Sequence, residues 1–378
     1  MNRIVLLIPC LQMGGTEIAT LETAKALLQH GFIPEVIVYF DEIDSSVLNT
    51  FLAANIKVCN LKVSRSNRFF GKLELFFRLK RKLKAQINDL IWVQYMTPTL
   101  LPLLVARFFT PKLVAAVHVA AGHYDVGGLR RMRWLARELC DCFVCVSNTT
   151  ALGIFGEIHK GSTYINRVHV LPNSIDMVAV NSVTRFNWRA ALDLPAESLL
   201  IGYVGRLTKN KGVDILIQAA ARLIIDFPHL HWIIVGGGPD RQDLECLVAS
   251  LNLSSVVSFV GVAPRDAVYS AFKGFDIAVA PSREEGFGLT ALEAMASGVP
   301  LVASRVDALS EVVLDGATGL LFEPENADDL AQSLQKLIKN PALREELSSA
   351  GVTHATRTYD KPIFQRRVSN MLQRLSFL

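Results

Sequence analysis

Residues 281–300 combine glycines, carboxylates and a predicted helix start in a way that suits a phosphorylated ligand. The segment follows a buried apolar run and reads Pro-Ser-Arg-Glu-Glu-Gly-Phe-Gly-Leu-Thr-Ala-Leu-Glu-Ala-Met-Ala-Ser-Gly-Val-Pro, which predicts a loop that opens a helix. Gly286 and Gly288 let the backbone come close to a ligand. The unpaired amides before Leu289 and Thr290, together with the helix dipole, form an anion site.

Two carboxylates frame this helix start. Glu285 lies on the loop, where it can accept hydrogen bonds from sugar hydroxyls, and Glu293 lies one turn into the helix, within reach of a ribose diol. Each also has a purely structural interpretation. Thr290 and Glu293 have the spacing of a capping box, and Glu284 and Glu285 can belong to a solvated loop.

A second segment, residues 204–212, reads Val-Gly-Arg-Leu-Thr-Lys-Asn-Lys-Gly and also leads from a strand into a loop and a helix. Its cations Arg206 and Lys211 could converge on a departing pyrophosphate and stabilise the charge that develops there without a metal. Considered alone, two such side chains are more typical of a solvated surface.

Taken together, these segments resemble the family 4 retaining glycosyltransferases, which have the GT-B fold. The family signature is a Glu, then Gly-Phe-Gly-Leu, a second Glu eight positions after the first, and Ala-Met-Ala-x-Gly-x-Pro. Glu285 and Glu293 have that spacing. The family's Gly-Arg-Leu-x-x-x-Lys-Gly is present in full from Gly205 to Gly212. The resemblance covers nearly the whole C-terminal half and only islands of the N-terminal half.

The resemblance implies a role for each matched residue. Glu285 would hold hydroxyls of a donor sugar, and Glu293 would bind the ribose. Arg206 and Lys211 would bind the diphosphate. The backbone contacts to the donor would come from Gly205, Gly286, Phe287, Gly288, Leu289 and Thr290.

Weaker matches extend the predicted site. Gly15, in Gly-Gly-Thr-Glu, resembles the family glycine that approaches the donor phosphate, and His118 ends a strand where the family often has a His near the sugar. The family's usual Asp after this His is replaced by Val119. Gly237 lies in a Val-Gly-Gly-Gly-Pro segment, and the backbone around Val262 would contact the base.

Alternating strands and helices must position these residues. Continuous apolar runs predict buried parallel strands, and helical periodicity predicts a helix over 18–29 with Thr16 as its cap. In the N-terminal half the predicted strands are 3–9, 35–40, 90–95, 113–118 and 142–146. In the C-terminal half they are 199–204, 231–235, 256–260, 275–280 and 300–304, separated by helices over 213–225, 241–251, 266–272 and 289–297.

This alternation predicts an α/β protein with two tandem Rossmann-like, doubly wound domains that face a central cleft. The predicted boundaries are 1–180 for an acceptor-side domain, 181–358 for a nucleotide-sugar-binding domain and 359–378 for a C-terminal helix that packs back towards the first domain. Its apolar residues Phe364, Val368, Met371, Leu372 and Leu375 have helical spacing.

Charge is unevenly distributed. The net charge is +4, but residues 1–185 carry 21 Lys and Arg against 13 Asp and Glu, and the remaining residues carry 18 against 22. From Lys62 to Lys84 there are nine basic residues and one acidic residue, interleaved with Phe and Leu at helical spacing. Two interpretations stay open: an amphipathic helix on an anionic membrane, or a core-packing helix with a solvated cationic face. Four arginines and one tryptophan could extend such a surface: Arg130, Arg131, Arg133, Arg137 and Trp134.

Composition narrows the class of protein. With 378 residues, 51% of them hydrophobic, the chain is large enough for two cores. The first ten residues suit a buried strand better than a signal peptide, and no apolar run is long enough to span a bilayer. Cys140, Cys142 and Cys145 lie in a strand-like run without histidines at zinc-finger spacing, which favours a structural role over metal binding. We expect the protein in the cytoplasm, where it could also bind the inner face of the cell membrane.

The sequence therefore predicts a retaining glycosyltransferase. We expect it to move a hexose-type sugar from a nucleoside diphosphate sugar, UDP rather than GDP, to a hydroxyl of a glycan or glycolipid acceptor in cell-surface polysaccharide or lipopolysaccharide synthesis. No metal, other cofactor or nucleic-acid partner is expected. Two alternatives remain: a non-catalytic sugar-nucleotide-binding module, and an NAD-dependent oxidoreductase built on Gly236–Gly238. In the latter, Arg241 stands where the last glycine of the dinucleotide fingerprint belongs.

Overall fold

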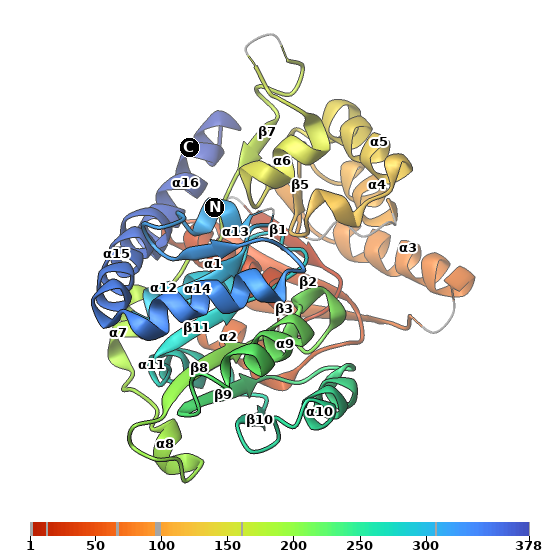
Figure 1. Cartoon of the computed structure of the whole chain (residues 1–378). Coiled ribbons are helices and arrows are strands. Elements are labelled where there is room, and N and C mark those ends of the chain that lie inside the picture. Colours follow the sequence, from red (N-terminus) through yellow and green to blue (C-terminus); the bar gives the residue numbers. More distant parts are fainter. Residues whose placement is uncertain are drawn as a thin grey trace. The chain divides into compact units, whose positions relative to one another are not determined.

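The computed structural model describes residues 3–12, 14–65, 68–94, 100–159, 162–306 and 308–377. The chain forms two compact units. Unit 1 comprises Met1–Ser174 and Lys361–Leu378, and unit 2 comprises Ile175–Asp360. Figure 1 traces the chain through both by colour. Among the described residues, no helix combines the length and the apolar character that a membrane span requires.

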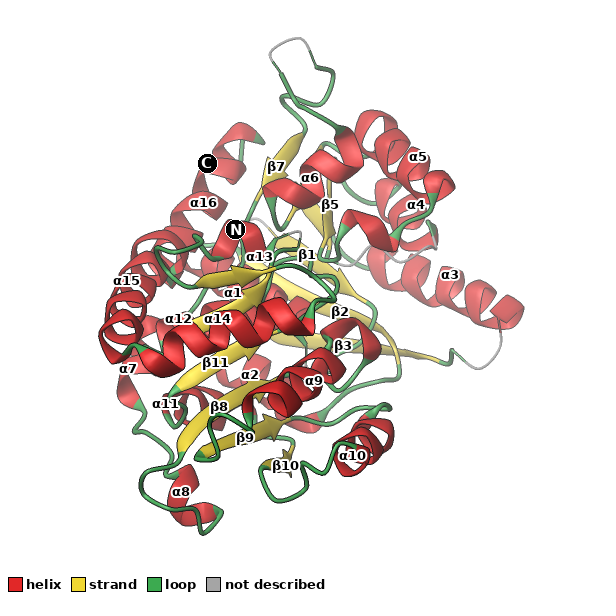
Figure 2. Ribbon diagram, viewed as in Figure 1, coloured by secondary structure: helices red, strands yellow, loops and turns green. Residues whose placement is uncertain are grey.

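Unit 1 is built on a parallel sheet of seven strands in the order β3-β2-β1-β4-β5-β6-β7. Figure 2 shows its strands flanked by helices. The strands are β1 (Arg3–Ile8), β2 (Ile33–Phe40), β3 (Lys57–Val63), β4 (Leu90–Val93), β5 (Lys112–Val117), β6 (Cys142–Cys145) and β7 (Val168–Val170). The helices are α1 (Gly15–Gln29), α2 (Ser45–Ala53), α3 (Arg68–Lys84), α4 (Leu101–Arg107), α5 (Val126–Trp134), α6 (Asn148–Phe155) and α16 (Lys361–Arg374).

The central strand β1 shows why these sequences form a buried sheet. Successive side chains of a strand point to opposite faces, and both faces of this sheet are covered. Val5 and Leu7 belong to one buried cluster, whereas Ile4, Leu6 and Ile8 belong to another. A strand that is buried on both sides must be apolar at every position, which is the continuous run seen in the sequence.

Helix α16 brings the end of the chain back to unit 1. It packs against α1, and Lys361 forms an ion pair with Glu22 of that helix at 3.2 Å. Its apolar side chains lie in the same buried cluster as Ile4, Leu6 and Ile8 of β1; they are Phe364, Val368, Met371 and Leu372, with Leu375 just beyond the helix. The contact division between the units falls after Ser174 and after Asp360.

Unit 2 is built on a parallel sheet of six strands in the order β10-β9-β8-β11-β12-β13. The strands are β8 (Leu199–Val204), β9 (Leu230–Val235), β10 (Val257–Gly261), β11 (Ile277–Ala280), β12 (Leu301–Ser304) and β13 (Leu320–Phe322). The helices are α7 (Met177–Ser182), α8 (Trp188–Ala191), α9 (Val213–Leu223), α10 (Arg241–Ser250), α11 (Val268–Lys273), α12 (Leu289–Ala296), α13 (Leu309–Val312), α14 (Ala327–Lys339) and α15 (Pro341–Tyr359).

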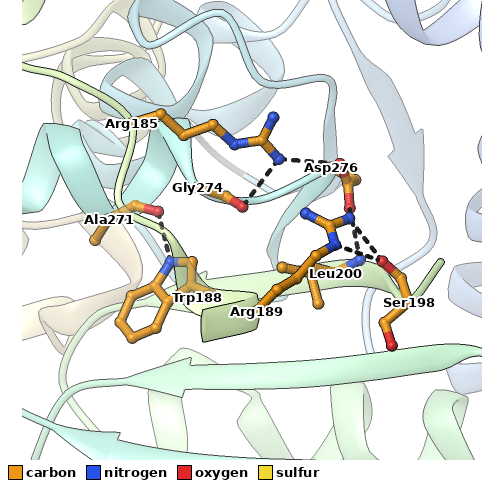
Figure 3. A network of polar contacts seen from close by, with 8 residues as sticks. All are labelled: Arg185, Trp188, Arg189, Ser198, Leu200, Ala271, Gly274 and Asp276. Carbon is orange, nitrogen blue, oxygen red and sulfur yellow. Dashed lines mark hydrogen bonds and ion pairs between the residues drawn. The ribbon is translucent and has the colours of Figure 1, made fainter. Parts of the chain in front are cut away.

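The segment that enters unit 2 is fixed to the base of its sheet (Figure 3). The Asp276 carboxylate, just before β11, accepts a hydrogen bond from the amide of Leu200 at 2.8 Å and pairs with Arg185 and Arg189. Nearby, Trp188 donates to the carbonyl of Ala271 at 3.0 Å. These contacts lie at the amino ends of β8 and β11, opposite the carboxyl edge at which ligands of open α/β sheets usually bind.

The predicted fold class, two tandem doubly wound α/β domains, is confirmed. Three local predictions need comment. Helix α1 begins at Gly15 with Gly14 as its N-cap and no side-chain cap, so the assignment of Thr16 as the cap is wrong. Lys62 belongs to strand β3, so the basic helix does not begin there but is described from Arg68. The strand predicted over 90–95 is described as far as Val93, and Tyr95 lies outside the described residues.

Candidate active site at the carboxyl edge of unit 2

The order of strands in unit 2 defines where a ligand should bind. The chain runs outward in one direction from β8 to β9 and β10, and in the other from β11 to β12 and β13. Strands β8 and β11 pair directly, with Ile201 opposite Ile277. The loops that follow two such strands separate at the carboxyl edge and leave a crevice, which is the usual ligand site of open α/β sheets. Both predicted segments, 204–212 and 281–300, leave this edge.

Lys211 and Glu285 meet at this switch point. The ammonium Nζ of Lys211 contacts the Oε1 carboxylate oxygen of Glu285. The same oxygen accepts a hydrogen bond from the hydroxyl of Ser282 at 3.0 Å. The Lys211 and Glu285 side chains are 23% and 12% exposed, so the pair is partly desolvated but still accessible to solvent. Two residues 74 positions apart are thereby combined into one polar centre.

Close backbone packing around the centre depends on glycines. Gly212 has φ of 67°, and a Cβ atom there would lie 2.0 Å from the carbonyl oxygen of Pro281. Gly236 has φ of 151°, and a Cβ atom there would lie 1.8 Å from the carbonyl oxygen of Gly205. Any other residue at either position would separate the loops.

Helix α12 presents its amino end at the same edge. Gly288 is its N-cap in the left-handed region, with φ of 90°. Within the described ranges, the amides of Phe287, Gly288, Leu289 and Thr290 donate to no acceptor. Four unpaired donors and the positive end of the helix dipole suit a phosphate or sugar oxygen.

Glu293 is not part of a capping box, since α12 begins at Leu289 and lacks a side-chain cap. Its carboxylate, almost fully buried, contacts the guanidinium of Arg265, and the same guanidinium lies over the ring of Tyr269 at 5.5 Å. Arg265 begins the short turn that follows the loop after β10. The cation compensates part of the cost of burying this carboxylate.

The loop after β10 carries the predicted base contact. Val262 is 65% exposed. A Cβ atom at Gly237 would lie 2.8 Å from Cγ2 of Val262, so the loops after β9 and β10 touch. An exposed valine beside a glycine backbone forms an apolar ledge that a planar base can cover.

Arg206 lies on the same loop as Lys211 but does not take part in the ion pair of Lys211 with Glu285. Its side chain is exposed and has no acidic partner within the described part of the chain. Its carbonyl oxygen accepts a hydrogen bond from the hydroxyl of Tyr203 at 2.9 Å, and that buried tyrosine supports the backbone of Gly205. Burial, with the nearby charge of Glu285, raises the pKa of Tyr203, which therefore stays neutral.

Two predicted residues lie in unit 1. Gly15 is the first residue of α1, and a Cβ atom there would meet only open space. His118 follows β5, and its Nε2 lies 3.1 Å from Oε1 of Gln94. Burial lowers the pKa of His118 to about 4, so the imidazole is neutral at neutral pH. Nδ1 of His118 and Nε2 of Gln94 are buried without a hydrogen-bond partner among the residues described.

The basic segment of unit 1 has one buried face and one exposed face. Leu75, Leu79 and Leu83 of α3 are buried in the core. A different face of the helix exposes Phe70, Leu73 and Phe77, followed along the helix by Lys80, Arg81 and Lys84. The proposed extension lies on and just after α5, where Arg130, Arg131, Arg133, Trp134 and Arg137 are all exposed.

The cysteine cluster is buried. Burial raises the pKa of Cys140 to about 12 and raises the pKa of Cys142 and Cys145 further. Protonated thiols are poor metal ligands, and no group of metal-binding side chains occurs among the residues that the structure describes.

Sequence reasoning missed several polar residues of these sites. Ser282 and Arg283 contact the loops that carry Lys211 and Glu285, Arg265 holds Glu293, and Gln94 holds His118. Nothing in the sequence beyond their polarity distinguished Ser282 and Arg283 from the other polar residues of the loop. Gln94 had one usable signal: it is a polar residue directly after a buried strand, at the edge where ligands bind.

Two family models match the chain. The model described as Glycosyltransferase Family 4 matches residues 13–178, and the model described as Glycosyl transferases group 1 matches residues 184–354. Among curated proteins, a D-inositol 3-phosphate glycosyltransferase of Streptosporangium roseum is 34% identical over 198 residues, which is 50% of this chain and 46% of that protein. The chain thus spans about half the length of the curated relatives it matches.

Solved structures match the whole fold. A crystal structure of Anabaena HepE in complex with UDP and glucose has a TM-score of 0.83 and 21% identity, covering 99% of this chain and 100% of that one. Sucrose-phosphate synthase from Thermosynechococcus elongatus also has a TM-score of 0.83 and 21% identity, covering 100% and 99%. At this identity the likeness concerns the fold.

Proposed function

Since the chain belongs to the group 1 and family 4 glycosyltransferases, which have the GT-B fold, we propose that it transfers a hexose-type sugar. The donor is a nucleoside diphosphate sugar and the acceptor is a hydroxyl. The configuration at the anomeric carbon is retained. The observation that carries the proposal is the contact of Lys211 with Glu285 at the switch point of unit 2. It places a cation for the diphosphate and a carboxylate for sugar hydroxyls side by side, at an edge where α12 offers unpaired amides.

In the proposed reaction, the bond between the anomeric carbon and the β-phosphate oxygen breaks. Negative charge then grows on the diphosphate, and Lys211, Arg206 and the amides of α12 stabilise it. The acceptor hydroxyl forms its bond to the anomeric carbon on the face that the diphosphate leaves, and its proton passes to a β-phosphate oxygen. Glu285 orients the sugar, and the roles that the family resemblance implies for Gly15 and His118 of unit 1 remain part of the proposal. We propose no metal in this step.

The preferred donor in this proposal is a UDP-sugar. Anabaena HepE, which shares the fold, has been crystallised in complex with UDP and glucose and also in complex with UDP-glucose. In the present chain, the ledge of Val262 and Gly237 would meet the base, and Glu293 would meet the ribose.

The proposed acceptor is a glycan or glycolipid of the cell surface, made at the inner face of the membrane. Support comes from the exposed face of α3, where apolar side chains are followed along the helix by basic ones. Such a face can insert Phe and Leu among acyl chains while Lys and Arg meet anionic headgroups.

Thermal-shift measurements with UDP, GDP and NAD test the nucleotide class. We expect UDP to raise the melting temperature of the purified protein most, because a ligand that binds only the folded state stabilises it by mass action. A shift with NAD but none with either nucleoside diphosphate would favour the oxidoreductase alternative. Release of free sugar from a donor sugar nucleotide separates an enzyme from a non-catalytic binding module, which would bind UDP and leave the donor intact.

A further inference from the structure

Arg283 connects the two loops of the proposed donor site in unit 2. Its backbone amide donates to the carbonyl of Asn210 at 2.8 Å, and its Nη1 donates to the carbonyl of Lys209 at 2.6 Å. Lys209–Lys211 form a short 3₁₀ turn that ends in Lys211. The residue two positions before Glu285 therefore holds the turn that carries its partner Lys211.

The same guanidinium forms a fork with Asp214 on the first turn of α9. Nη1 donates to Oδ1 at 2.8 Å and Nη2 to Oδ2 at 2.7 Å, and Nε donates to Glu325 at 2.7 Å. The Arg283 side chain is only 18% exposed. Parallel bonds of this kind fix the orientation of both partners, which a single ion pair between long side chains does not.

The charges of this pair persist over a wide pH range. Burial works to raise the pKa of Asp214, but the hydrogen bonds and charge of Arg283 outweigh it and hold the pKa of the carboxyl below its usual range. The hydrogen bonds to Asp214 raise the pKa of Arg283. Loss of the guanidinium would leave the carbonyl oxygen of Lys209 without this donor and the half-buried carboxylate of Asp214 without its cation.

We propose that Arg283 is a positioning residue for the diphosphate site: it holds the turn of Lys209–Lys211 against the loop of Glu285, so that the ammonium of Lys211 is fixed where the β-phosphate of the donor binds. The inference rests on the proposed function. It predicts an effect specific to the β-phosphate, because Arg283 touches the turn that carries Lys211 and is not among the residues assigned to the base or the ribose.

The test compares UDP with UMP in Arg283→Ala by titration calorimetry. In the wild type we expect UDP to bind more tightly than UMP because of its second phosphate. In Arg283→Ala the affinity for UDP should fall about tenfold, whereas that for UMP should change less than about twofold. Arg283→Lys keeps the charge but not the fork, so its UDP affinity should be intermediate. Should Arg283→Ala fail to fold, Asp214→Asn, which keeps the shape and weakens the fork, should shift the same ratio in the same direction.

Arg222→Ala is the matched control. Arg222 lies on the same helix α9 and forms a two-atom contact with Asp328 of α14, away from the proposed site. It should lower stability modestly and leave the ratio of UDP to UMP affinity unchanged. Equal losses for UDP and UMP in Arg283→Ala, or the same ratio change in Arg222→Ala, would refute the positioning role. A wild type that binds neither nucleotide would instead overturn the proposed function.

Discussion

Nζ of Lys211 lies against Oε1 of Glu285, so a cation from the loop after β8 and an anion from the loop after β11 neutralise each other at the centre of the site. The side chains are partly desolvated, which makes their interaction stronger than that of a surface pair and makes each costly to leave alone. Each group is therefore a determinant of the other's position.

Lys211→Ala should lower turnover by about 10²–10³-fold, because it removes a fixed positive charge from the departing diphosphate. Donor hydrolysis or transfer rates measure this loss. Circular dichroism should show the fold retained, since Lys211 is half-buried at a loop and not in a core. Lys209→Ala on the same turn is exposed and should keep near-normal turnover. Near-normal activity of Lys211→Ala would remove this lysine from the mechanism.

Glu293→Gln should reduce the preference for ribose over deoxyribose. Wild-type protein should bind UDP more tightly than 2′-deoxy-UDP by about five- to tenfold, because the carboxylate accepts from a ribose hydroxyl. In Glu293→Gln the two ligands should bind within about twofold of each other. Glu284→Gln, an exposed carboxylate of the neighbouring loop, is the control and should keep the preference. A preference unchanged in Glu293→Gln would leave Glu293 as a partner of Arg265 alone.

His118 should make stability depend on pH. Its pKa is about 4 in the folded protein, against an ordinary value of 6.5, because burial disfavours the charged imidazole. Between these pH values the unfolded chain binds a proton at His118 that the folded chain does not. The contribution of His118 to the free energy of unfolding should therefore decrease as pH falls from about 6.5 to about 4, and it should be constant above about 6.5. In His118→Asn the melting temperature should change less with pH over this interval. An identical pH profile in the variant would assign the slope to other groups.

Replacement of apolar residues on the exposed face of α3 should weaken membrane binding. Leu73→Ser with Phe77→Ser should lower the partition onto vesicles that contain phosphatidylglycerol by about tenfold or more, since each removes apolar area that would enter the interface. Flotation of the protein with such vesicles measures this. Ile225→Ser, an exposed apolar residue of unit 2, should have no effect. Equal binding of the wild type to uncharged vesicles would argue against the basic residues as headgroup ligands.

The sequence predicted those features that depend on local pattern. A strand such as β1, buried on both faces, must be continuously apolar, so its run was recognisable. Lys211 and Glu285 were predicted because their loops resemble the signature of the family 4 glycosyltransferases, and the strand order brings these two loops together. The short edge strand β7 (Val168–Val170) carries too few residues for such a pattern and was missed.

The assignment of Thr16 as a helix cap was wrong for a local reason: Gly14 is extended and α1 begins one residue before Thr16.

Contacts between residues that are distant in the sequence were not predictable. Arg283 finds Asp214 at a separation of 69 residues, and Arg265 finds Glu293 at 28. Nothing in a single sequence says which of many charged side chains will face each other across two loops.

The return of α16 to unit 1 determines how the protein can be divided. Unit 2 is one uninterrupted stretch, Ile175–Asp360, and is a reasonable fragment to express separately. Unit 1 is not: a fragment ending near Ser174 would leave the apolar side of α1, including Leu27, without the residues Val368 and Leu372 that share its cluster. To express unit 1 alone, Met1–Ser174 should therefore be joined to Lys361–Leu378 through a flexible linker that replaces unit 2. A fragment of Met1–Ser174 without Lys361–Leu378 should aggregate, because it exposes the apolar side of α1.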